Sequence, residues 1–358
     1  PDPFNAYAQF LLGLSSSTGK TLQHELMTGR EWQLGLYVRD HWQVTRDLTL
    51  NLGLRWGGYP LMTRADRGIE HYDDTTTDVL LGEGLLGTLW AALRTRFPEA
   101  RRCGLAIDAR VAELWSLPPA PPELELLAVE LPQGEAAKDR KTLAAIQDRW
   151  IDLRRDEPAV VVGGGAALDV GGLAAATVRR GLPWIAVATT VVAMADAAVG
   201  GKTAVNHPRG KNLLGTFHPP TLVLSDVATL STLPARERTA GLAELYKCGR
   251  IADAVLLATL RDGAPQDAAA WIDALQRSVA VKARLVEADE RDEGVRRLLN
   301  YGHTTGHALE RVLGNERMRH GEAVAIGMDV AARIAVARGL LSADQRAEQV
   351  ADLESLEM

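Results

Sequence analysis

The sequence contains little of what a disulfide-linked, exported or membrane-spanning helical protein needs. Only two cysteines, Cys103 and Cys248, occur in 358 residues, so a disulfide framework is excluded and two reduced, buried thiols are expected. No run of about eighteen apolar residues is present, and the N-terminus lacks the basic, apolar and small-residue order of a signal peptide. The net charge of -6 argues against a general affinity for nucleic acid. We therefore expect a cytoplasmic protein, in which a local basic pocket can still bind a small anion.

The first seventy or so residues differ in pattern from the rest of the chain. In residues 32–45 and 48–56 apolar and polar side chains alternate, and a two-residue turn separates the two runs. This period of two predicts a β-hairpin with one apolar and one polar face. Residues 1–72 resemble the barrel of TonB-dependent outer-membrane receptors, chiefly in REWQLGLYVRDHWQVTRDLTLNLGLRW. One hairpin cannot close a barrel, so we expect no membrane association and assign no chemistry to residues 1–73.

Between residues 79 and 226 short apolar runs alternate with helical patterns. The runs VLLG, CGLAID, LELLAVEL, PAVVVGGG, PWIAVATT and TLVLSD predict buried strands of a parallel sheet. Helices are expected from Ala109, from about Ala136 and from about Asp169 onward. This alternation predicts a doubly wound α/β domain over residues 74–238.

After the last strand pattern only Ala- and Leu-rich helical patterns follow, so we expect residues 239–358 to form an all-helical domain. In this region His303 and His307 are one helical turn apart in NYGHTTGHALE, and His320 follows in HGEAVAIGM. Glu244 lies upstream in GLAELYKCG. One carboxylate and two or three imidazoles suit a divalent metal, and three protein ligands would leave room for substrate oxygens.

Polar or glycine residues follow several predicted strands of the α/β domain. The glycines of residues 163–165 stand between a buried strand and a helix, where backbone N–H groups can bind a pyrophosphate, although a tight turn alone also needs glycine. Asp108 ends an earlier strand, where a carboxylate can bind ribose hydroxyls. Since ligands bind at the carboxyl ends of such strands, we expect a nucleotide there. Further polar residues at this edge are Glu135, Lys138, Thr189 and Thr190.

Several basic residues occur near these positions, and a solvated surface charge is the alternative for each. Lys202 and Lys211 flank the turn-rich segment of GGKTAVNHPRGKN. The alternative is least convincing for Lys202, between glycines and an apolar stretch, and for Lys247, inside the apolar AELYKCG. Lys282 and Arg296 flank an acidic stretch. Cations that converge beside a metal and a nucleotide imply an anionic, hydroxylated substrate.

Five motifs occur together in one order within about residues 79–340. They are GGGAALDVGGLAAATVRRG, VATTVVAMADAAVGGKTAVNHPRGKNLLGTFHPP, TLPARERTAGLAELYKCG, ADERDEGVRRLLNYGHTTGHALE and HGEAVAIGM. In this region the chain resembles 3-dehydroquinate synthase and the related sugar-phosphate cyclases. The resemblance implies an NAD-binding domain, a helical domain that binds zinc or cobalt, and a homodimer. It also implies a step of the shikimate pathway, in which 3-deoxy-arabino-heptulosonate 7-phosphate becomes 3-dehydroquinate and phosphate, with NAD regenerated in each turnover.

The resemblance also implies roles for individual residues, and GGKTAVNHPRGKN favours dehydroquinate synthases over aminocyclitol or valiolone-type cyclases. The implied metal ligands are Glu244, His303 and His320. The implied catalytic residues are Asp196, Lys202, Lys247 and His307. The implied substrate-binding residues are Arg180, which would reach the phosphate site of the partner subunit, and Asn212, Lys282, Arg296 and Asn300. The implied NAD-binding residues are Asp108, Glu135, Lys138, Gly164, Gly165, Asp169, Thr189, Thr190, Lys211 and Thr232.

Two features depart from the family pattern. Leu168 replaces a glycine that is usual in the nucleotide turn, and we expect its branched side chain to crowd that turn. The chain ends at Met358, before the family's last few dozen residues, which carry a further lysine near the substrate phosphate. We therefore expect the NAD and metal sites to form and turnover to be weak or absent.

Two other functions stay open at this stage. A metal-dependent polyol dehydrogenase of the glycerol dehydrogenase type resembles the family in its two-domain plan, but the anion-binding set of Lys202, Lys247, Lys282 and Arg296 argues against it. A non-enzymatic fragment of an outer-membrane receptor, joined by gene fusion or by an assembly error, would owe its role to residues 1–73. The missing export signal and the lack of further barrel strands argue against this alternative.

Overall fold

The computed structural model divides the chain into two compact units, residues 1–63 and 64–358. In the first unit β1 (Leu34–Thr45) and β2 (Leu48–Gly58) pair antiparallel, which confirms the two strands of the expected hairpin. The turn between them and the side chains of both strands lie outside the described residues, so the expected apolar and polar faces stay a prediction. The structure describes residues 34–45, 48–58, 69–70, 77–314 and 317–358.

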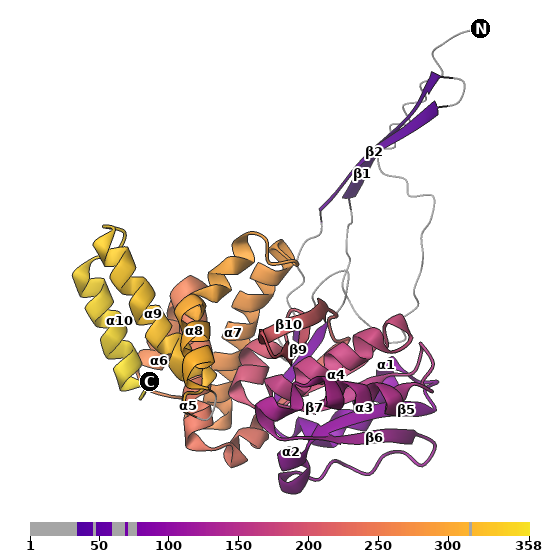
Figure 1. Ribbon diagram of the computed structural model, residues 1–358, viewed down its shortest axis with the longest axis horizontal. Coiled ribbons are helices and arrows are strands. Elements are labelled where there is room, and N and C mark those ends of the chain that lie inside the picture. The colour runs from indigo at the N-terminus through magenta and orange to yellow at the C-terminus, as the bar shows by residue number, and fades with distance from the viewer. Residues whose placement is uncertain (1–33, 46–47, 59–68, 71–76, 315–316) are drawn as a thin grey trace. The chain divides into compact units, whose positions relative to one another are not determined.

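The second unit contains a seven-stranded sheet in the order β3-β4-β11-β8-β7-β5-β6 (Figure 1). All neighbours from β4 to β6 pair in parallel, and only β3 pairs antiparallel, at one edge. Every residue of β7, β8 and β11 is buried, as strands covered on both faces must be. The six parallel strands predicted from the sequence are therefore confirmed. The strands are β3 (Ile69–Glu70), β4 (Asp78–Gly82), β5 (Arg102–Asp108), β6 (Glu125–Leu131), β7 (Ala159–Gly163), β8 (Trp184–Ala188) and β11 (Leu222–Asp226).

Helices cover both faces of this sheet. Side chains alternate along β7, so that Val160 and Val162 pack in the apolar cluster that contains α1, whereas Ala159 and Val161 pack in the cluster that contains α3 and α4. This arrangement is the expected doubly wound α/β fold. The helical segments of this part are η1 (Leu85–Thr88), α1 (Leu89–Arg96), α2 (Ala109–Leu114), η2 (Gly134–Ala137), α3 (Arg140–Trp150), α4 (Gly165–Thr177), η3 (Val178–Arg180), η4 (Ala193–Ala197) and η5 (Val227–Thr232).

Two helices of the α/β part begin elsewhere than the sequence predicted. Helix α4 begins at Gly165 rather than near Asp169, so residue 168 lies in its first turn. The Leu168 side chain is therefore 1% exposed in the core and does not line the cleft, and the expectation that it crowds the nucleotide turn is wrong. Helix α3 begins at Arg140 rather than near Ala136, because the Asp139 carboxylate caps it by accepting from the N–H of Thr142 at 2.7 Å.

A second antiparallel hairpin was missed by the sequence analysis. Strands β9 (Lys202–His207) and β10 (Gly210–Phe217) pair with each other, and Pro208 and Arg209 connect them. The clustered Pro, Gly, Asn and Lys residues of this segment indicated turns and no strand was predicted there. The hairpin matters for function, because it carries the lysine and asparagine residues of the GGKTAVNHPRGKN motif.

From residue 235 to residue 358 every described regular element is a helix, as expected. In Figure 1 these helices gather beside the sheet. One apolar cluster joins Val161 and Ala186 of the sheet to Tyr246, Leu275 and Val324 of the helices, so the two parts share a core. The expected domain boundaries at residues 73 and 238 stay predictions. The helical segments are α5 (Ala235–Ala252), α6 (Ala254–Arg261), α7 (Ala268–Ala288), η6 (Val295–Asn300), α8 (His303–Leu313), α9 (His320–Ala337) and α10 (Ala343–Ser355).

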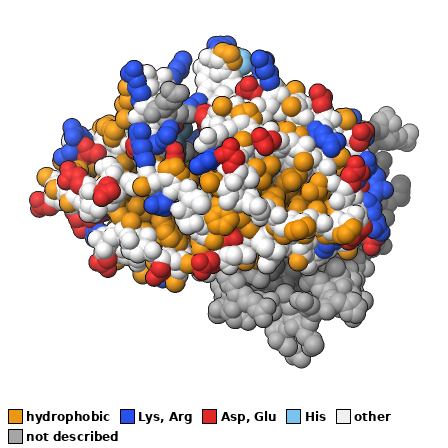
Figure 2. Space-filling model, turned by 90° about the horizontal axis from the view of Figure 1, so that it is seen from below, with side chains coloured by type: hydrophobic (Ala, Val, Ile, Leu, Met, Phe, Trp, Pro, Cys, Tyr) orange, Lys and Arg blue, Asp and Glu red, His pale blue; other side chains and the backbone are white. Residues whose placement is uncertain are grey.

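Cys103 and Cys248 are buried free thiols, which confirms the expectation from cysteine content. Burial raises the pKa of both, to about 11 for Cys248. Among the described residues, no helix is both long and apolar enough to span a membrane. Figure 2 shows acidic and basic side chains interspersed over the face drawn.

Candidate active site

A cleft of about 1240 Å³ collects residues from the carboxyl ends of the strands, from the β9–β10 hairpin and from the helical part. All but two of the residues to which the sequence analysis assigned a role line this cleft. Of the two exceptions, Glu244 is 1% exposed and lies against His303 and His320, which do line it. Arg180 is exposed at the end of η3, outside the cleft. The cleft thus brings together residues that are more than 200 positions apart in the chain, such as Asp108 and His320.

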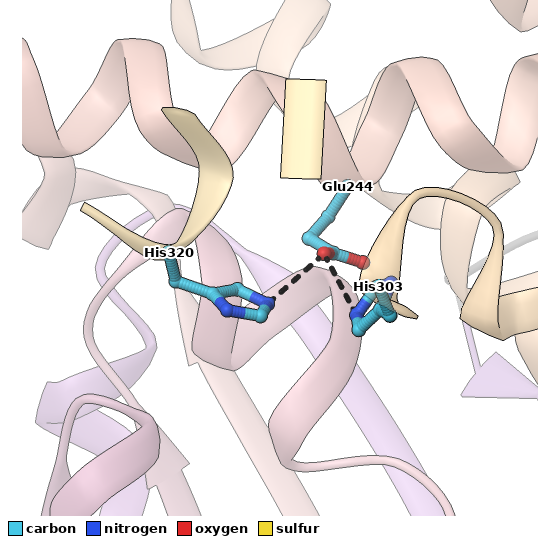
Figure 3. Close-up of side chains that lie close together, drawn as sticks. All are labelled: Glu244, His303 and His320. Carbon is cyan, nitrogen blue, oxygen red and sulfur yellow. Dashed lines mark ion pairs between the residues drawn. The ribbon is translucent and has the colours of Figure 1, made fainter. Parts of the chain in front are cut away.

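Three of these residues form a compact group that suits a metal ion (Figure 3). Glu244 projects from α5, His303 from the first turn of α8, and His320 from the first turn of α9. Glu244 Oε1 lies 3.7 Å from His303 Nε2 and 3.4 Å from His320 Nε2, and the three ligand atoms lie within 4.8 Å of one another. The structure therefore brings together the three ligands implied by the resemblance.

The hydrogen bonds of the two imidazoles leave both Nε2 atoms available as ligands. His303 Nδ1 donates to the backbone carbonyl of Tyr301 at 3.2 Å, and His320 Nδ1 lies 3.3 Å from a carboxylate oxygen of Glu310. Both Nε2 atoms then point toward Glu244 Oε1, a buried oxygen without a hydrogen-bond partner. Such an oxygen beside two imidazole nitrogens is a donor set that suits a divalent metal such as Zn²⁺.

The pKa values of these groups show what the metal would replace. Burial lowers the pKa of His303 to about 4, so this ligand is neutral near pH 7. Burial also opposes the protonation of His320, but Glu244 and Glu310 outweigh it and raise its pKa to about 10. In the metal-free protein the His320 proton thus supplies positive charge between the two carboxylates, and a bound cation would take its place.

A buried set of alternating charges lies next to the metal group. The Lys247 ammonium donates to Glu244 Oε2, and the Lys282 ammonium donates to both the carboxylate and the backbone carbonyl of Asp196. Burial opposes the charge on Lys247, but Glu244 outweighs it and raises the pKa of this lysine. Burial lowers the pKa of Lys282, and Asp196 offsets part of that effect. Both ammonium groups line the cleft, where they can donate further hydrogen bonds to an anion.

Lys202 and Arg296 supply further positive charge to the same cleft. Lys202 Nζ donates to Asp292 at 2.6 Å, and the Arg296 guanidinium donates to the backbone carbonyls of Glu290 at 2.6 Å and Gly200 at 3.0 Å. Burial lowers the pKa of Arg296. Asp292 is a polar partner that the sequence analysis missed, although its acidic segment was noted beside Arg296.

The nucleotide end of the cleft has free polar groups and little room for side chains. A Cβ atom added to Gly164 would lie 3.1 Å from Thr190, and one added to Gly165 would lie 3.2 Å from Ala197. No side chain of the N-cap residue Gly164 caps helix α4, which begins here, and the buried Thr189 hydroxyl has no hydrogen-bond partner. A backbone turn of this kind before a helix N-terminus fits the pyrophosphate of a dinucleotide.

The other residues implied for NAD surround this turn. Asp108 caps α2 by accepting from the N–H groups of Arg110 at 2.9 Å and Val111 at 3.3 Å, and its second oxygen accepts from the N–H of Gly134 at 3.2 Å. Its carboxylate therefore has a structural role in addition to any contact with a ligand. Further polar contacts join Lys138 to Asp169 and Asn212, Glu135 to Asn206 at 2.6 Å, and Thr232 to Trp115 at 2.8 Å.

Glu310 is a second residue that the sequence analysis missed. It lies on α8 in the motif GHALE, is 5% exposed, and contacts both His320 and Lys211. Burial opposes its charge, but the hydrogen bonds and charges of these two partners outweigh burial and lower its pKa to about 2. The available signal was its spacing of one turn from His307.

The fold and the site define a class of proteins in which a doubly wound α/β part and a helical part with a His–His–Glu group enclose one cleft. Within that class, the chain belongs to the 3-dehydroquinate synthase family. The model for the N-terminal part of 3-dehydroquinate synthase matches residues 128–240, and the model for its C-terminal part matches residues 241–358. A model described as an outer membrane beta barrel domain matches residues 1–103. The last part of that match, residues 78–103, forms β4, η1, α1 and the start of β5 in the structure.

Curated relatives support the family assignment. The chain is 48% identical to 3-dehydroquinate synthase of Geobacter metallireducens over 238 residues, which are 65% of this chain and 66% of that protein. It is 41% identical to 3-dehydroquinate synthase of Citrifermentans bemidjiense over 290 residues, which are 76% of this chain and 78% of that protein. The chain therefore spans about two thirds to four fifths of the length of these relatives.

Solved structures of sugar-phosphate cyclases have the same fold. The 2-epi-5-epi-valiolone synthase of Streptomyces hygroscopicus subsp. jinggangensis, with NAD⁺ and Zn²⁺ bound, matches with a TM-score of 0.70 and 29% identity over 80% of this chain and 81% of that one. A 2-deoxy-scyllo-inosose synthase with carbaglucose-6-phosphate, NAD⁺ and Co²⁺ matches with a TM-score of 0.71 and 26% identity over 80% and 82%. A probable glycerol dehydrogenase of Sinorhizobium meliloti, at 18% identity and a TM-score of 0.51, shares the fold alone.

Proposed function

We propose that this chain is an NAD- and metal-dependent carbon–oxygen lyase that converts 3-deoxy-arabino-heptulosonate 7-phosphate to 3-dehydroquinate and phosphate. The observation that carries the proposal is the buried Glu244 Oε1, which forms no hydrogen bond and lies between the Nε2 atoms of His303 and His320, in a cleft that also contains a nucleotide turn and several cations. When bound, NAD supplies a reversible hydride acceptor and the Zn²⁺ or Co²⁺ ion polarises substrate oxygens.

The other residues of the cleft bind the substrate, position its binding groups or transfer protons, according to where they lie. The cations Lys202, Lys247, Lys282 and Arg296 bind the anionic groups of the substrate, with Asn212 and Asn300 as further hydrogen-bonding groups. Asp196 holds Lys282 in place through its hydrogen bonds. His307, whose ring centroid lies 5.3 Å from that of His303, is exposed at the cleft and can exchange a proton with the substrate or its phosphate.

The comparisons favour a dehydroquinate synthase among the cyclases. Identity is 48% and 41% to the two synthases above, but 29% and 26% to the valiolone and inosose cyclases. The proposal includes a small sugar-phosphate substrate and a cytoplasmic location. It also includes a homodimer in which Arg180, exposed outside the cleft of its own subunit, serves the phosphate site of the partner.

The test is phosphate release from the heptulosonate phosphate by the purified full chain, with a catalytic amount of NAD and added zinc. In line with the weak turnover expected from the sequence, wild-type protein should release phosphate and form 3-dehydroquinate at a low rate without accumulating NADH, whereas His320→Ala should lose both products. A variant of a surface carboxylate on α10, Glu348→Gln, is the matched control and should behave as wild type. Equal phosphate release by wild type and His320→Ala would contradict the ligand assignment. Accumulation of NADH with glycerol and no phosphate release would instead support a polyol dehydrogenase.

A further inference from the structure

Glu310 connects one expected metal ligand with the β9–β10 hairpin. Its Oε2 lies 3.3 Å from His320 Nδ1, and its Oε1 accepts from Lys211 Nζ at 2.9 Å. The Glu310 side chain is 4% exposed, so water does not replace either partner easily. Each carboxylate oxygen therefore has one partner from a different element, His320 from α9 and Lys211 from β10.

The two imidazole ligands are held in different ways. His303 Nδ1 is fixed by a backbone carbonyl, that of Tyr301 at 3.2 Å, and its side chain is 12% exposed. His320 is the first residue of α9 and its side chain is 31% exposed, so no preceding helical turn packs against its ring. The contact of its Nδ1 is with a side chain, Glu310, whose own position depends on Lys211.

We propose that Glu310 is a positioning residue for the metal ligand His320, and that Lys211 holds the Glu310 carboxylate in place. This inference rests on the metal site of the proposed function. An acceptor at Nδ1 fixes the proton on that nitrogen, turns the Nε2 lone pair toward Glu244, and makes Nε2 a better donor. Without Glu310 the His320 ring can rotate and can bind through the wrong nitrogen.

The position of Lys211 is itself defined by the nucleotide end of the cleft. The next residue, Asn212, accepts from Lys138, which also pairs with Asp169. The N–H of Asn212 donates to the Asn206 side chain at 3.0 Å, which closes the hairpin tip. Lys211 therefore extends toward Glu310 from a segment that is anchored among the residues expected to bind NAD.

The experiment is a titration of the metal-free full chain with Co²⁺, followed by the visible d–d absorption of the bound ion, and a chelator competition for Zn²⁺. Glu310→Gln keeps the shape of the side chain and should weaken metal binding by about 10- to 100-fold and alter the cobalt spectrum. Glu310→Asp keeps the charge with a shorter reach and should lose less. Glu348→Gln is the matched control and should change neither the metal affinity nor the cobalt spectrum. Glu348 lies on α10, and its carboxylate pairs with Arg261 of α6 at 2.7 Å. Circular dichroism confirms that each variant is folded.

The outcomes separate this inference from the proposed function. If wild type binds Co²⁺ and Glu310→Gln binds it with the same affinity and spectrum, the positioning role is overturned and the metal site stands. If wild type binds no Co²⁺, both are overturned. Glu310 also forms a possible ligand group with His307 and His320. A titration that ends at two equivalents in wild type and at one in Glu310→Gln would make Glu310 a ligand itself and overturn the proposal.

A double-variant cycle tests the part assigned to Lys211. Lys211→Met should raise the metal dissociation constant in the wild-type background. It should leave this constant unchanged in the Glu310→Gln background, because Lys211 acts through the Glu310 carboxylate. Lys141→Met, at an exposed position of α3, is the control for loss of a lysine charge. An equal effect of Lys211→Met in both backgrounds would overturn its role.

Discussion

Glu244 and Lys247 form the most deeply buried ion pair of the described site. Removing one charge at a time measures how much the pair contributes to the stability of the fold. Both side chains are 1% exposed, and they are one turn apart on α5. In Glu244→Gln the Lys247 ammonium stays buried without the carboxylate to which it donates, and the charge of Asp196 offsets only part of the loss, so the cost is up to about 3 to 5 kcal/mol. At about 2.1 cal/mol/K per residue, the unit of residues 64–358 unfolds with an entropy of about 0.6 kcal/mol/K, so the metal-free variant should melt about 5 to 8 °C below wild type.

The companion variants determine whether unpaired charge is the cause. Lys247→Met should cost less than Glu244→Gln, because Glu244 keeps His320 at 3.4 Å, whose pKa of about 10 makes it a cation. Glu244→Gln combined with Lys247→Met should recover most of the loss, since neither charge is then left alone. The assay is thermal unfolding followed by circular dichroism in a chelator, with Glu348→Gln as a surface control. A combined variant that melts no higher than Glu244→Gln would refute this reasoning.

Three further predictions concern the metal and nucleotide sites. Metal binding near neutral pH should release about one proton per ion, because His320 is protonated below its pKa of about 10 and must lose that proton to bind. The release should vanish above that pH. Calorimetry in buffers of different ionisation enthalpy measures the number of protons released. Gly327→Ala should destabilise the protein by about 1 to 3 kcal/mol or more and weaken zinc binding. The added Cβ would lie 1.9 Å from the carbonyl oxygen of Gly302, the residue before His303. Urea unfolding measures the loss of stability, and chelator competition measures the loss of zinc affinity. Gly164→Ala should weaken NAD binding about tenfold, because the added methyl group would lie 3.1 Å from Thr190 and must displace that side chain in the nucleotide turn. A fluorescence titration that shows unchanged affinity would contradict this.

The parallel sheet could be predicted from the sequence because its strands are short apolar runs. In β7 and β8 every residue is buried, so composition alone marks them, and the glycines after β7 mark the nucleotide turn. The β9–β10 hairpin could not be predicted in this way, since most residues of β10 are exposed and the strand begins with Gly, Lys and Asn, which indicate a turn. Its two strands are defined by pairing with each other rather than by burial.

The metal group shows the same division between local and tertiary information. The spacing of His303 and His307 indicated a metal-binding helix face, but the residues alone could not decide which of the two is a ligand. In the structure His303 faces Glu244, whereas His307 is exposed at the cleft. The spacing of Glu310 from His307 placed it on the same helix face, but its contact with Lys211, 99 residues away in the chain, could not be predicted from sequence.

The apolar cluster that joins the sheet to the helical part has a consequence for how the protein unfolds. Val161 of the sheet and Leu275 and Val324 of the helices belong to that one cluster, so separating the halves would expose apolar surface on each. Residues 77–234 and 235–358 should therefore melt in a single transition, and neither should persist as a folded fragment after proteolysis. A wide hinge between the two parts would expose this shared interior, so we expect the cleft to open by small shifts of packed elements.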